Sequence, residues 1–512
     1  MRSSTLALWA LNAASIAAAP GACGSHNLDS RQYPTGAKAF ASSSDGKYKL
    51  SAFDAPVKGA GSPPPSGAST WKLSVDDTPA GRRQQITGFG AAVTDATVSV
   101  INALSGADRA KLLRELMTSE GADFALLRHT IGASDLSAPP AYTYDDTDGN
   151  VEDKTLSKFG LGDRGNAMAE MLAEMKKLKP ELTILGSPWA PPAWMQLDRK
   201  LMGGTEQNNL DHAYVDEYAQ YFVKYVQAYA AKGAPIDAIT IQNEPLNSQS
   251  GMPTMYVYAD ESGKLIRDNV GPALKKAGLK TSVWAYDHNT DQPSYPQTVL
   301  DTAPEFVDTV AWHVSIPSLS TTVTTFTDEQ SPQCYATDNK WSVLSDFHAK
   351  NPNAAQYMTE CWTSSKSTPW NQASSFTVGP LQNWAKGSLA WTLGTDTNDG
   401  PYLGGCDTCR GLVVIDTAAK TYEFTVDYYM MAQYSKYMPR GATVLAGTGS
   451  HTYDGGAGIQ SVASANPDGT RTVVVENTFG NDVYLTLNTN AKGGEQWSGK
   501  ILANSVVTWV LP

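Results

Sequence analysis

The sequence predicts an α/β protein: a (β/α)8 TIM barrel with a side β-sandwich domain formed by both chain ends. The barrel is indicated by eight apolar, strand-like runs that alternate with helical segments over the middle of the chain. The sandwich is indicated by runs of alternating apolar and polar residues on either side of this region. The 512 residues suffice for both, since they allow a barrel of about 250 to 400 residues plus a smaller domain.

The first residues have the pattern of an export signal. Met1 and Arg2 give a positive start, residues 5–19 carry no charge, and alanines occupy positions 17–19. The apolar run is too short to span a bilayer, and no later segment reaches about 18 uncharged apolar residues. We therefore expect residues 1–19 to be a signal peptide and the mature protein to be secreted, extracellular and without membrane insertion.

Residues 20–80 are expected to contribute strands to the side domain. The segment is rich in Ser, Gly, Ala and Pro up to residue 68, and it contains two strand-like runs, 48–53 and 70–75. In the second run, Trp71, Leu73 and Val75 alternate with polar residues, which is typical of a strand with one buried face.

Residues 81–440 are predicted to form the barrel. Its eight expected strands are 86–93, 124–132, 182–189, 236–245, 281–288, 307–314, 355–362 and 387–394. Between them, segments 163–178 and 213–232 place Met and Tyr side chains at helical spacing, which we interpret as core packing. Apolar strands separated by helices indicate a parallel sheet, and eight such units favour closure into a barrel. No Gly-rich nucleotide-binding pattern opens a helix.

Residues 441–512 are predicted to supply most of the β-sandwich side domain. After a Gly-rich turn at 455–458, alternating runs occur at 459–464, 471–477, 482–488 and 504–511. Their period of two residues indicates antiparallel strands with one face buried. Together with the two runs before the barrel, they predict one sandwich built from both ends of the chain.

Charge and cysteine content exclude several function classes. A formal net charge of −12 argues against nucleic acid and polyanionic substrates, because both need a basic surface. Of the five cysteines, Cys406 and Cys409 form a C-x-x-C in a Gly-rich loop, which suggests a local disulfide in an exported protein. No second C-x-x-C exists, so a zinc site is not expected.

Two glutamates stand at the ends of predicted strands. The fourth strand ends in Gln-Asn-Glu-Pro, which contains Glu244, and the seventh ends in Met-Thr-Glu-Cys-Trp, which contains Glu360. Catalytic groups of such a barrel lie at the C-terminal ends of its strands. Two carboxyl groups suit the hydrolysis of a glycosidic bond, in which one protonates the leaving oxygen and the other stabilises the anomeric carbon. Their separation, which distinguishes retention from inversion, cannot be read from the sequence.

The sequence around these glutamates resembles glycoside hydrolase family 30, a family of retaining (β/α)8 glycosidases. The resemblance rests on residues 88–95, 128–135, 187–195, 242–246 and 286–289. The most specific segment is Ser-Pro-Trp-Ala-Pro-Pro-Ala-Trp-Met, at 187–195. The match extends over about residues 45 to 512 and includes the side domain.

The resemblance implies a role for each site residue. Glu244 matches the acid/base of the family, Glu360 the nucleophile, and Asn243 the residue that binds the sugar 2-hydroxyl. The positions that line the subsite of the cleaved sugar are Arg128, Asp135, Trp189, His313 and Trp391. On physical grounds, a guanidinium beside the nucleophile is expected to lower its pKa and keep it ionised.

One position departs from the family pattern. Family members often carry an aromatic residue two positions after the His, with its hydroxyl near the nucleophile, whereas this chain has Ser315 there. Either another tyrosine, for which we select Tyr286, supplies that hydroxyl or the contact is absent.

Within the family, three segments look most like fungal endo-β-1,6-glucanases: 128–137, the Asn-Glu-Pro-Leu-Asn-Ser-Gln stretch and 404–411. This likeness implies a monomeric hydrolase that acts on β-1,6-linked glucan polysaccharide and uses no metal and no other cofactor. A neutral extracellular polymer suits an acidic, exported protein.

Three alternatives stay open at this point. The first is another family 30 β-glycosidase, such as a glucosylceramidase, a β-xylosidase or a xylanase. The second is a non-catalytic wall-binding protein, which would not need both glutamates. The third is a metal-dependent barrel hydrolase, which needs several His or Asp residues at strand ends, although the chain has only 7 His in total.

Overall fold

The computed structural model describes residues 36–204, 208–313, 341–366, 370–449 and 458–512. The expected signal peptide at 1–19 and Ser315 lie outside the described residues. Residues Thr35–Pro512 form one compact unit. Over the ranges that the structure describes, no helix is both long enough and apolar enough to cross a membrane.

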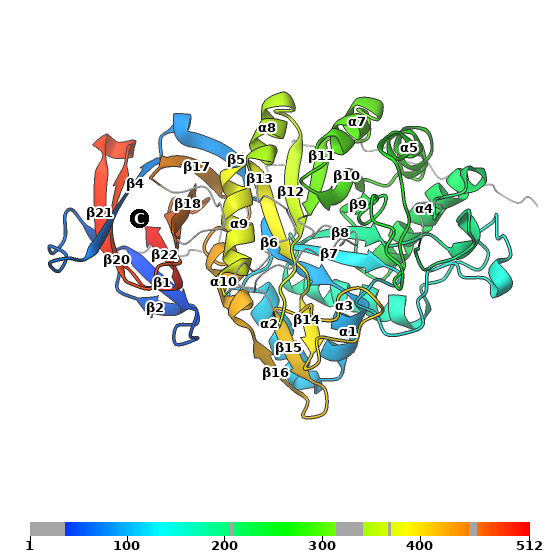
Figure 1. Cartoon of the computed structure of the whole chain (residues 1–512), viewed down its shortest axis with the longest axis horizontal. Coiled ribbons are helices and arrows are strands. Elements are labelled where there is room, and N and C mark those ends of the chain that lie inside the picture. Colours follow the sequence, from blue (N-terminus) through cyan, green and yellow to red (C-terminus); the bar gives the residue numbers. More distant parts are fainter. Residues whose placement is uncertain (1–35, 205–207, 314–340, 367–369, 450–457) are drawn as a thin grey trace, which may run out of the picture. The chain divides into compact units, whose positions relative to one another are not determined.

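Eight parallel strands close into the predicted barrel (Figure 1). They are β6 (Gly88–Val93), β7 (Leu126–Ile131), β8 (Thr183–Pro188), β9 (Ala238–Thr240), β10 (Ser282–Asn289), β11 (Thr309–His313), β12 (Ala355–Glu360) and β13 (Ala385–Ala390). The predicted barrel is therefore confirmed. The largest difference in length is at β9, because the chain leaves the ladder after Thr240, well before the predicted end at residue 245.

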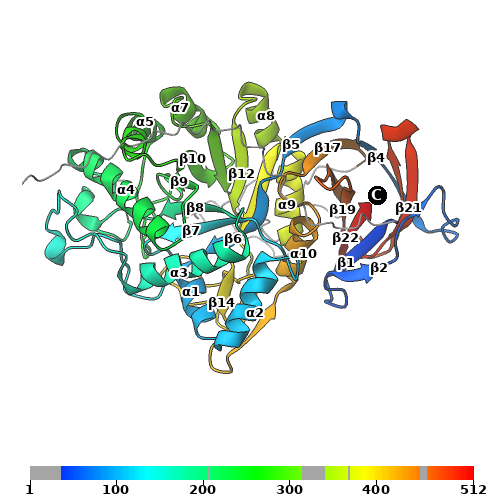
Figure 2. The same cartoon turned by 180° about the vertical axis from the view of Figure 1, so that it is seen from behind.

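Helices cover the outside of the barrel (Figure 2). They are α1 (Asp95–Asn102), α2 (Gly106–Met117), α3 (Gly162–Leu178), α4 (Val215–Ala231), α5 (Ala259–Leu265), α6 (Gly271–Lys276), α7 (Ser294–Thr302), α8 (Ser342–Lys350), α9 (Gln372–Gln382) and α10 (Val426–Ser435). The predicted helical segments correspond to α3 and α4, and their Met and Tyr stripes are buried as expected. Polar side chains cap the N-termini of two other helices. The Thr94 hydroxyl accepts a hydrogen bond from the Thr97 amide at α1, and the Ser105 hydroxyl accepts one from the Asp108 amide at α2.

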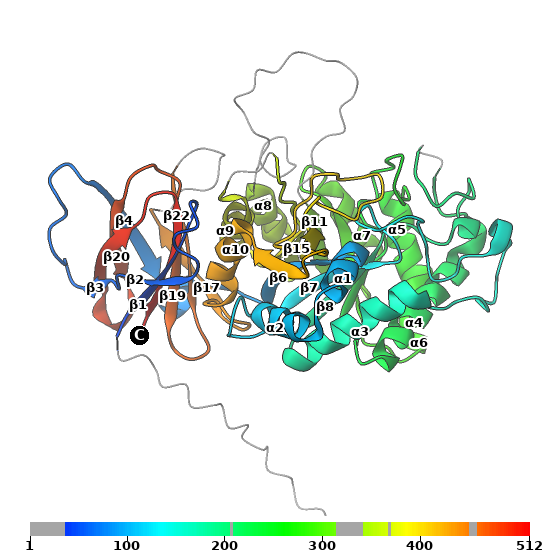
Figure 3. The ribbon, with the colours of Figure 1, turned by 90° about the horizontal axis from the view of Figure 1, so that it is seen from below.

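Strands from both chain ends form one continuous sheet of 11 strands. Figure 3 shows blue strands from the start of the chain gathered with orange and red strands from its end. They are β1 (Lys38–Ser43), β2 (Ser51–Phe53), β3 (Val57–Lys58), β4 (Ser69–Asp76), β5 (Arg82–Gln85), β17 (Thr443–Thr448), β18 (Ile459–Ala465), β19 (Arg471–Asn477), β20 (Val483–Thr489), β21 (Glu495–Ile501) and β22 (Ser505–Leu511). The first half of β17 pairs with β18 and its second half with β4, so this strand joins the two layers of a sandwich. The predicted antiparallel pairing holds between β20 and β21, but on its other side β20 runs parallel to β4.

The β19–β22 layer is buried on both faces. Val473 and Val507 belong to the apolar core between the sandwich layers. Their neighbours Val474 and Val506 belong to the core of the barrel. Because successive side chains of a strand point to opposite faces, this layer is shared between the two cores. A further small sheet, β14 (Gly394–Asp396), β15 (Val413–Asp416) and β16 (Thr421–Phe424), follows the last barrel strand.

Candidate active site

Both predicted glutamates line one pocket of about 360 Å³. Glu360 is the last residue of β12, and Glu244 lies in the loop that follows β9. Only 9% of Glu244 and 7% of Glu360 is exposed. The other lining residues come from the loops after several strands: Asp135, Trp189, Asn243, Asn247, Gln249, Met252, Trp362, Trp391, Gly405, Cys406 and Thr408.

The two carboxyl groups are close together. One oxygen of Glu244, one oxygen of Glu360 and a ring nitrogen of His313 all lie within 4.8 Å of one another. Carboxyl groups about 5 to 5.5 Å apart are typical of retaining glycosidases, whereas inverting enzymes leave a gap of about 6.5 to 9.5 Å for a water molecule. The spacing therefore favours direct attack by one carboxylate.

His313 lies between the two glutamates. Its Nδ1 is 3.2 Å from Oε1 of Glu244 and 3.8 Å from Oε1 of Glu360, while its Nε2 is 2.7 Å from Oδ1 of Asp287. Burial alone would lower the pKa of His313, but the surrounding carboxylates, Glu360 foremost, raise it to about 9. The ring is therefore an imidazolium at neutral pH and donates a hydrogen bond from each nitrogen.

Arg128, on β7, is fully buried and links the nucleophile candidate to its neighbours. Its Nη1 donates to Oε2 of Glu360 at 2.7 Å. Its Nη2 donates to Oδ1 of Asn243 at 2.6 Å and to Oδ2 of Asp287 at 2.9 Å. The guanidinium also lies 4.8 Å from the ring centre of Trp189. These contacts leave the guanidinium a single orientation.

Burial raises the pKa of Glu360 above its usual value. The cations His313 and Arg128 act in the opposite direction, and the charge of Glu244 adds to the rise. The expected lowering by Arg128 is thus present, but it does not decide the net direction, because desolvation of a buried carboxylate is the larger effect.

Asp135 and two tryptophans form the walls of the pocket. The Trp189 and Trp391 rings stack with centroids 5.1 Å apart. Burial, with a further contribution from Glu360, raises the pKa of Asp135 to about 7. Its Oδ1 is buried and has no hydrogen-bond partner among the described residues.

Arg128 and His313 lie fully buried behind the pocket and contact its two glutamates, whereas Tyr286 lies away from it. Its ring packs against Tyr295 and Trp312 in the layer between barrel and helices, 4.7 and 5.7 Å between ring centres. The reason is a bulge in β10, where Tyr286 has φ 81° and Asp287 has φ 61°. The bulge reverses the strand's alternation and turns Tyr286 outward.

The same bulge turns Asp287 inward, a residue that was not selected from the sequence although it lies in the family-like segment 286–289. Asp287 is fully buried and accepts hydrogen bonds from both cations of the site, Arg128 and His313, and from Ser187, Thr240 and Thr359. Burial would raise its pKa, but Arg128 and His313 hold the pKa well below its usual value. A second sequence signal is an acidic residue inside an apolar strand.

Glu244, His313 and Glu360 are also the one group of the described residues whose donor atoms are close enough to hold a metal ion. A histidine ligand must offer a lone pair. With a pKa of about 9, the His313 ring carries a proton on each nitrogen at neutral pH. These side chains therefore suit acid–base chemistry better than metal binding.

The predicted Cys406–Cys409 disulfide is present, with Cα atoms 5.5 Å apart. Cys361, which follows Glu360, is disulfide-bonded as well. The Cys406–Cys409 bridge adjoins the pocket, because Cys406 lines it, whereas the Cys361 side chain belongs to the main apolar core.

Comparisons with known proteins agree with this architecture. Residues 86–438 match the glycosyl hydrolase family 30 TIM-barrel domain, and residues 441–509 match the family's beta sandwich domain. The chain is 62% identical to an endo-1,6-beta-D-glucanase of Neurospora crassa over 93% of this chain and 95% of that protein. It is 57% identical to the endo-1,6-beta-D-glucanase BGN16.3 of Trichoderma harzianum over 93% and 94% of the two chains.

Among solved structures, the endo-beta1,6-glucanase BT3312 superimposes with a TM-score of 0.77 at 26% identity, covering 93% of this chain and 99% of the other. The two domain matches follow each other in the expected order, and the relatives are highly identical along nearly the whole chain. Both findings point to the same family. The chain belongs to glycosyl hydrolase family 30.

Proposed function

We propose that this protein is a secreted, retaining endo-β-1,6-glucanase that uses Glu360 as nucleophile and Glu244 as acid/base. The observation that carries the proposal is the pair of buried strand-end carboxyl groups, whose nearest oxygens lie within 4.8 Å. The substrate is taken from the relatives, since the chain is 62% identical to an endo-1,6-beta-D-glucanase.

In the first step, Oε1 of Glu360 attacks the anomeric carbon while Glu244 gives its proton to the leaving oxygen. Arg128 engages Oε2 of Glu360 at 2.7 Å, which leaves Oε1 for the attack. The glycosidic C–O bond breaks as the ester bond to Glu360 forms, and the shortened glucan leaves with the proton.

In the second step, the Glu244 carboxylate takes a proton from water as the water oxygen attacks the anomeric carbon. The ester bond breaks, Glu360 regains its charge, and the sugar keeps its original β configuration. Negative charge thus alternates between the two glutamates. His313 lies 3.2 Å from one and 3.8 Å from the other, so its cation faces whichever glutamate is ionised.

The pocket walls suit the cleaved sugar. Oδ1 of Asn243 is held by Arg128, which directs the amide nitrogen away from this contact and toward a sugar 2-hydroxyl. Asp135 offers an acceptor to a second hydroxyl, and Trp189 and Trp391 offer apolar faces to the ring's C–H groups.

For the chain as a whole we propose a signal peptide at 1–19, an N-terminal segment at 20–80, a catalytic barrel at 81–440 and a β-sandwich domain at 441–512. The proposal of secretion is supported by the charge and apolar pattern of the first residues. N-terminal sequencing of the protein recovered from culture medium tests it, since the mature chain should begin near residue 20.

Two variants test the mechanism. Glu360→Gln should abolish turnover and covalent trapping by a 2-fluoro glucoside. Glu244→Ala should lose activity on β-1,6-glucan. Azide should restore cleavage of an activated aryl glucoside by this variant, because azide attacks the glycosyl-enzyme without the general base that water needs. Glu423→Gln, at an exposed position on β16, is the matched control and should behave as wild type. Near-normal turnover by Glu360→Gln would contradict the nucleophile assignment.

Substrate identity is tested by product analysis on pustulan, β-1,3-glucan, xylan and glucosylceramide. Release of short β-1,6-linked oligosaccharides from the interior of pustulan is expected. Activity confined to xylan or glucosylceramide would replace the substrate by that of another family member.

A further inference from the structure

A loop of eight residues, 404–411, forms one wall of the pocket; we call it the strap. One side of the strap is paired with the chain just beyond Glu360. The Arg410 amide donates to the Thr363 carbonyl at 2.8 Å, and the Thr363 hydroxyl donates back to the Arg410 carbonyl at 2.7 Å. The strap is thereby attached to the continuation of the nucleophile's strand.

The other side of the strap packs against the loop of Glu244 and against Asp135. A Cβ added to Gly404 would overlap the Gly251 backbone, and one added to Gly405 would overlap the Asp135 side chain and lie 2.8 Å from Sδ of Met252. Two consecutive glycines therefore permit a backbone approach that no other residue allows here.

At its centre, the strap contacts the substrate-facing carboxyl directly. The backbone N–H of Cys406 donates a hydrogen bond to Asp135, and the Leu403 amide, just before the strap, donates to the Asp135 carbonyl at 2.5 Å. Both groups thus fix Asp135 relative to the pocket. Cys406 and Thr408 themselves line the pocket.

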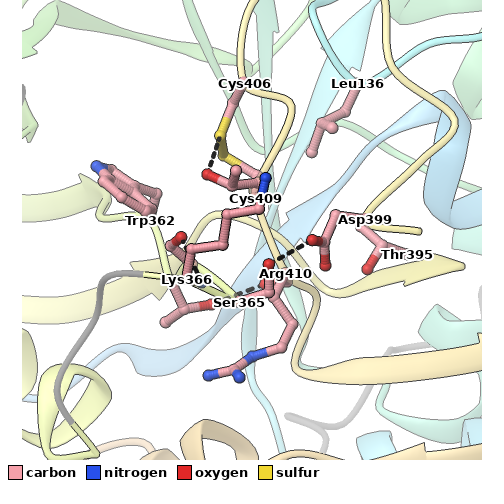
Figure 4. Close-up of a disulfide and its surroundings, with 12 residues drawn as sticks. Leu136, Trp362, Ser365, Lys366, Thr395, Asp399, Cys406, Cys409 and Arg410 are labelled. Carbon is pink, nitrogen blue, oxygen red and sulfur yellow. Dashed lines mark hydrogen bonds between the residues drawn. A yellow bond between two sulfur atoms is a disulfide. The ribbon is translucent and has the colours of Figure 1, made fainter. Parts of the chain in front are cut away.

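The disulfide joins the two sides of the strap. Cys409 is fully buried among apolar side chains that include Leu136, Trp362 and Trp391. Figure 4 shows the bridge with Trp362 on one side and Leu136 on the other. Because Cys406 is bonded to this anchored residue, the pocket-lining half of the strap cannot move away from Asp135 independently.

We propose that the Cys406–Cys409 disulfide and the glycines before it are substrate-positioning elements: they hold the strap against Asp135 and so set the affinity of the pocket for a β-1,6-linked glucan chain. This inference rests on the proposed function. The contacts of the strap are to Asp135 and to the pocket wall, so we expect it to act on substrate binding more than on the chemical steps.

Two variants loosen the strap in different ways. Cys406→Ser combined with Cys409→Ser removes the bridge and leaves the bridge at Cys361 intact. Gly405→Ala keeps both bridges but forces the strap away from Asp135 and Met252. Gly480→Ala is the matched control, because a Cβ at Gly480 meets nothing within 4 Å.

The measurement is kcat and KM on purified β-1,6-gluco-oligosaccharides, with thermal midpoints recorded for every variant. We expect KM to rise at least tenfold for both strap variants, kcat to change less than threefold, and Gly480→Ala to match wild type. Should the double variant fail to fold, Gly405→Ala decides. A fall in kcat with KM unchanged, or wild-type values in Gly405→Ala, would overturn the proposal. An inactive wild type would instead contradict the proposed function.

Discussion

Replacing Glu476 with Gln is expected to stabilise the protein at neutral pH. Glu476 lies on β19, fully buried, on the face that packs against α9. It accepts hydrogen bonds from Asn371 at 3.3 Å, from Ser375 at 3.4 Å and from Gln460 at 3.4 Å. All these partners are neutral, so burial raises the pKa of Glu476 to about 7.

The magnitude follows from that shift, since the ordinary pKa of the group is 4.5. One pKa unit corresponds to about 1.4 kcal/mol, so an ionised Glu476 makes the folded state roughly 3 kcal/mol less stable than a protonated one. Below pH 4.5 the carboxyl is protonated in both states. As pH rises from 4.5 to about 7, the Glu476 carboxyl loses its proton in the unfolded chain before it does so in the folded protein. The stability that the protonated carboxyl contributes is lost over this pH range.

Gln is neutral at every pH and has the shape of the protonated side chain. Its amide can also donate to Oε1 of Gln460, which has no hydrogen-bond partner among the described residues. Urea unfolding followed by tryptophan fluorescence, at pH 4.5 and pH 8, gives the free energy of unfolding of both proteins. We expect the variant to exceed wild type by about 3 kcal/mol at pH 8 and to equal it at pH 4.5. Glu423→Gln, at an exposed site, controls for the loss of one negative charge. Equal stability of Glu476→Gln and wild type at pH 8 would refute the argument.

Three further predictions concern the site. Asp287→Asn should lower kcat/KM roughly 100-fold, because Arg128 and His313 lose the carboxylate that orients them. Steady-state kinetics measures this effect, and a loss of less than threefold would contradict the prediction. Tyr286→Phe should keep kcat/KM within about twofold of wild type, since the hydroxyl does not line the pocket and has no hydrogen-bond partner among the described residues. A larger loss in the same assay would show that the Tyr286 hydroxyl contributes to the site. Arg128→Gln should move the acid limb of the kcat/KM profile to higher pH, because Gln carries no charge and Arg128 lowers the pKa of Glu360, the proposed nucleophile, which must be ionised to attack. An unmoved limb would argue against that coupling.

Much of the fold could be predicted because its signals are local. Each barrel strand is a short apolar run, and such runs are visible wherever both faces of a strand are buried. The β-sandwich was predicted in outline from alternation, but the strands β1, β3, β5, β17 and β21 were not predicted, and the parallel pairing of β4 with β20 was not expected. Strand pairing depends on which segments meet in space, and β4 and β20 are separated by the whole barrel in the sequence.

The residues of the candidate site likewise fall into those that local sequence identifies and those that only the tertiary structure identifies. Glu244 and Glu360 could be selected from their positions near predicted strand ends, and Arg128 and Asp135 from motifs that resemble the family, because both signals are properties of consecutive residues. The choice between Tyr286 and Asp287 could not, since a single bulge decides which of two neighbours faces the pocket.

By itself, the sequence determined that two carboxyl groups stand at strand ends of a closed barrel and that a cysteine pair lies in a late loop. Only the tertiary structure decided three features of the site. His313 lies as a cation between those carboxyl groups, Asp287 accepts hydrogen bonds from Arg128 and His313, and the strap contacts Asp135. The physical reason is that protonation, burial and close approach are set by groups distant in the chain, whereas strand identity is set by neighbours.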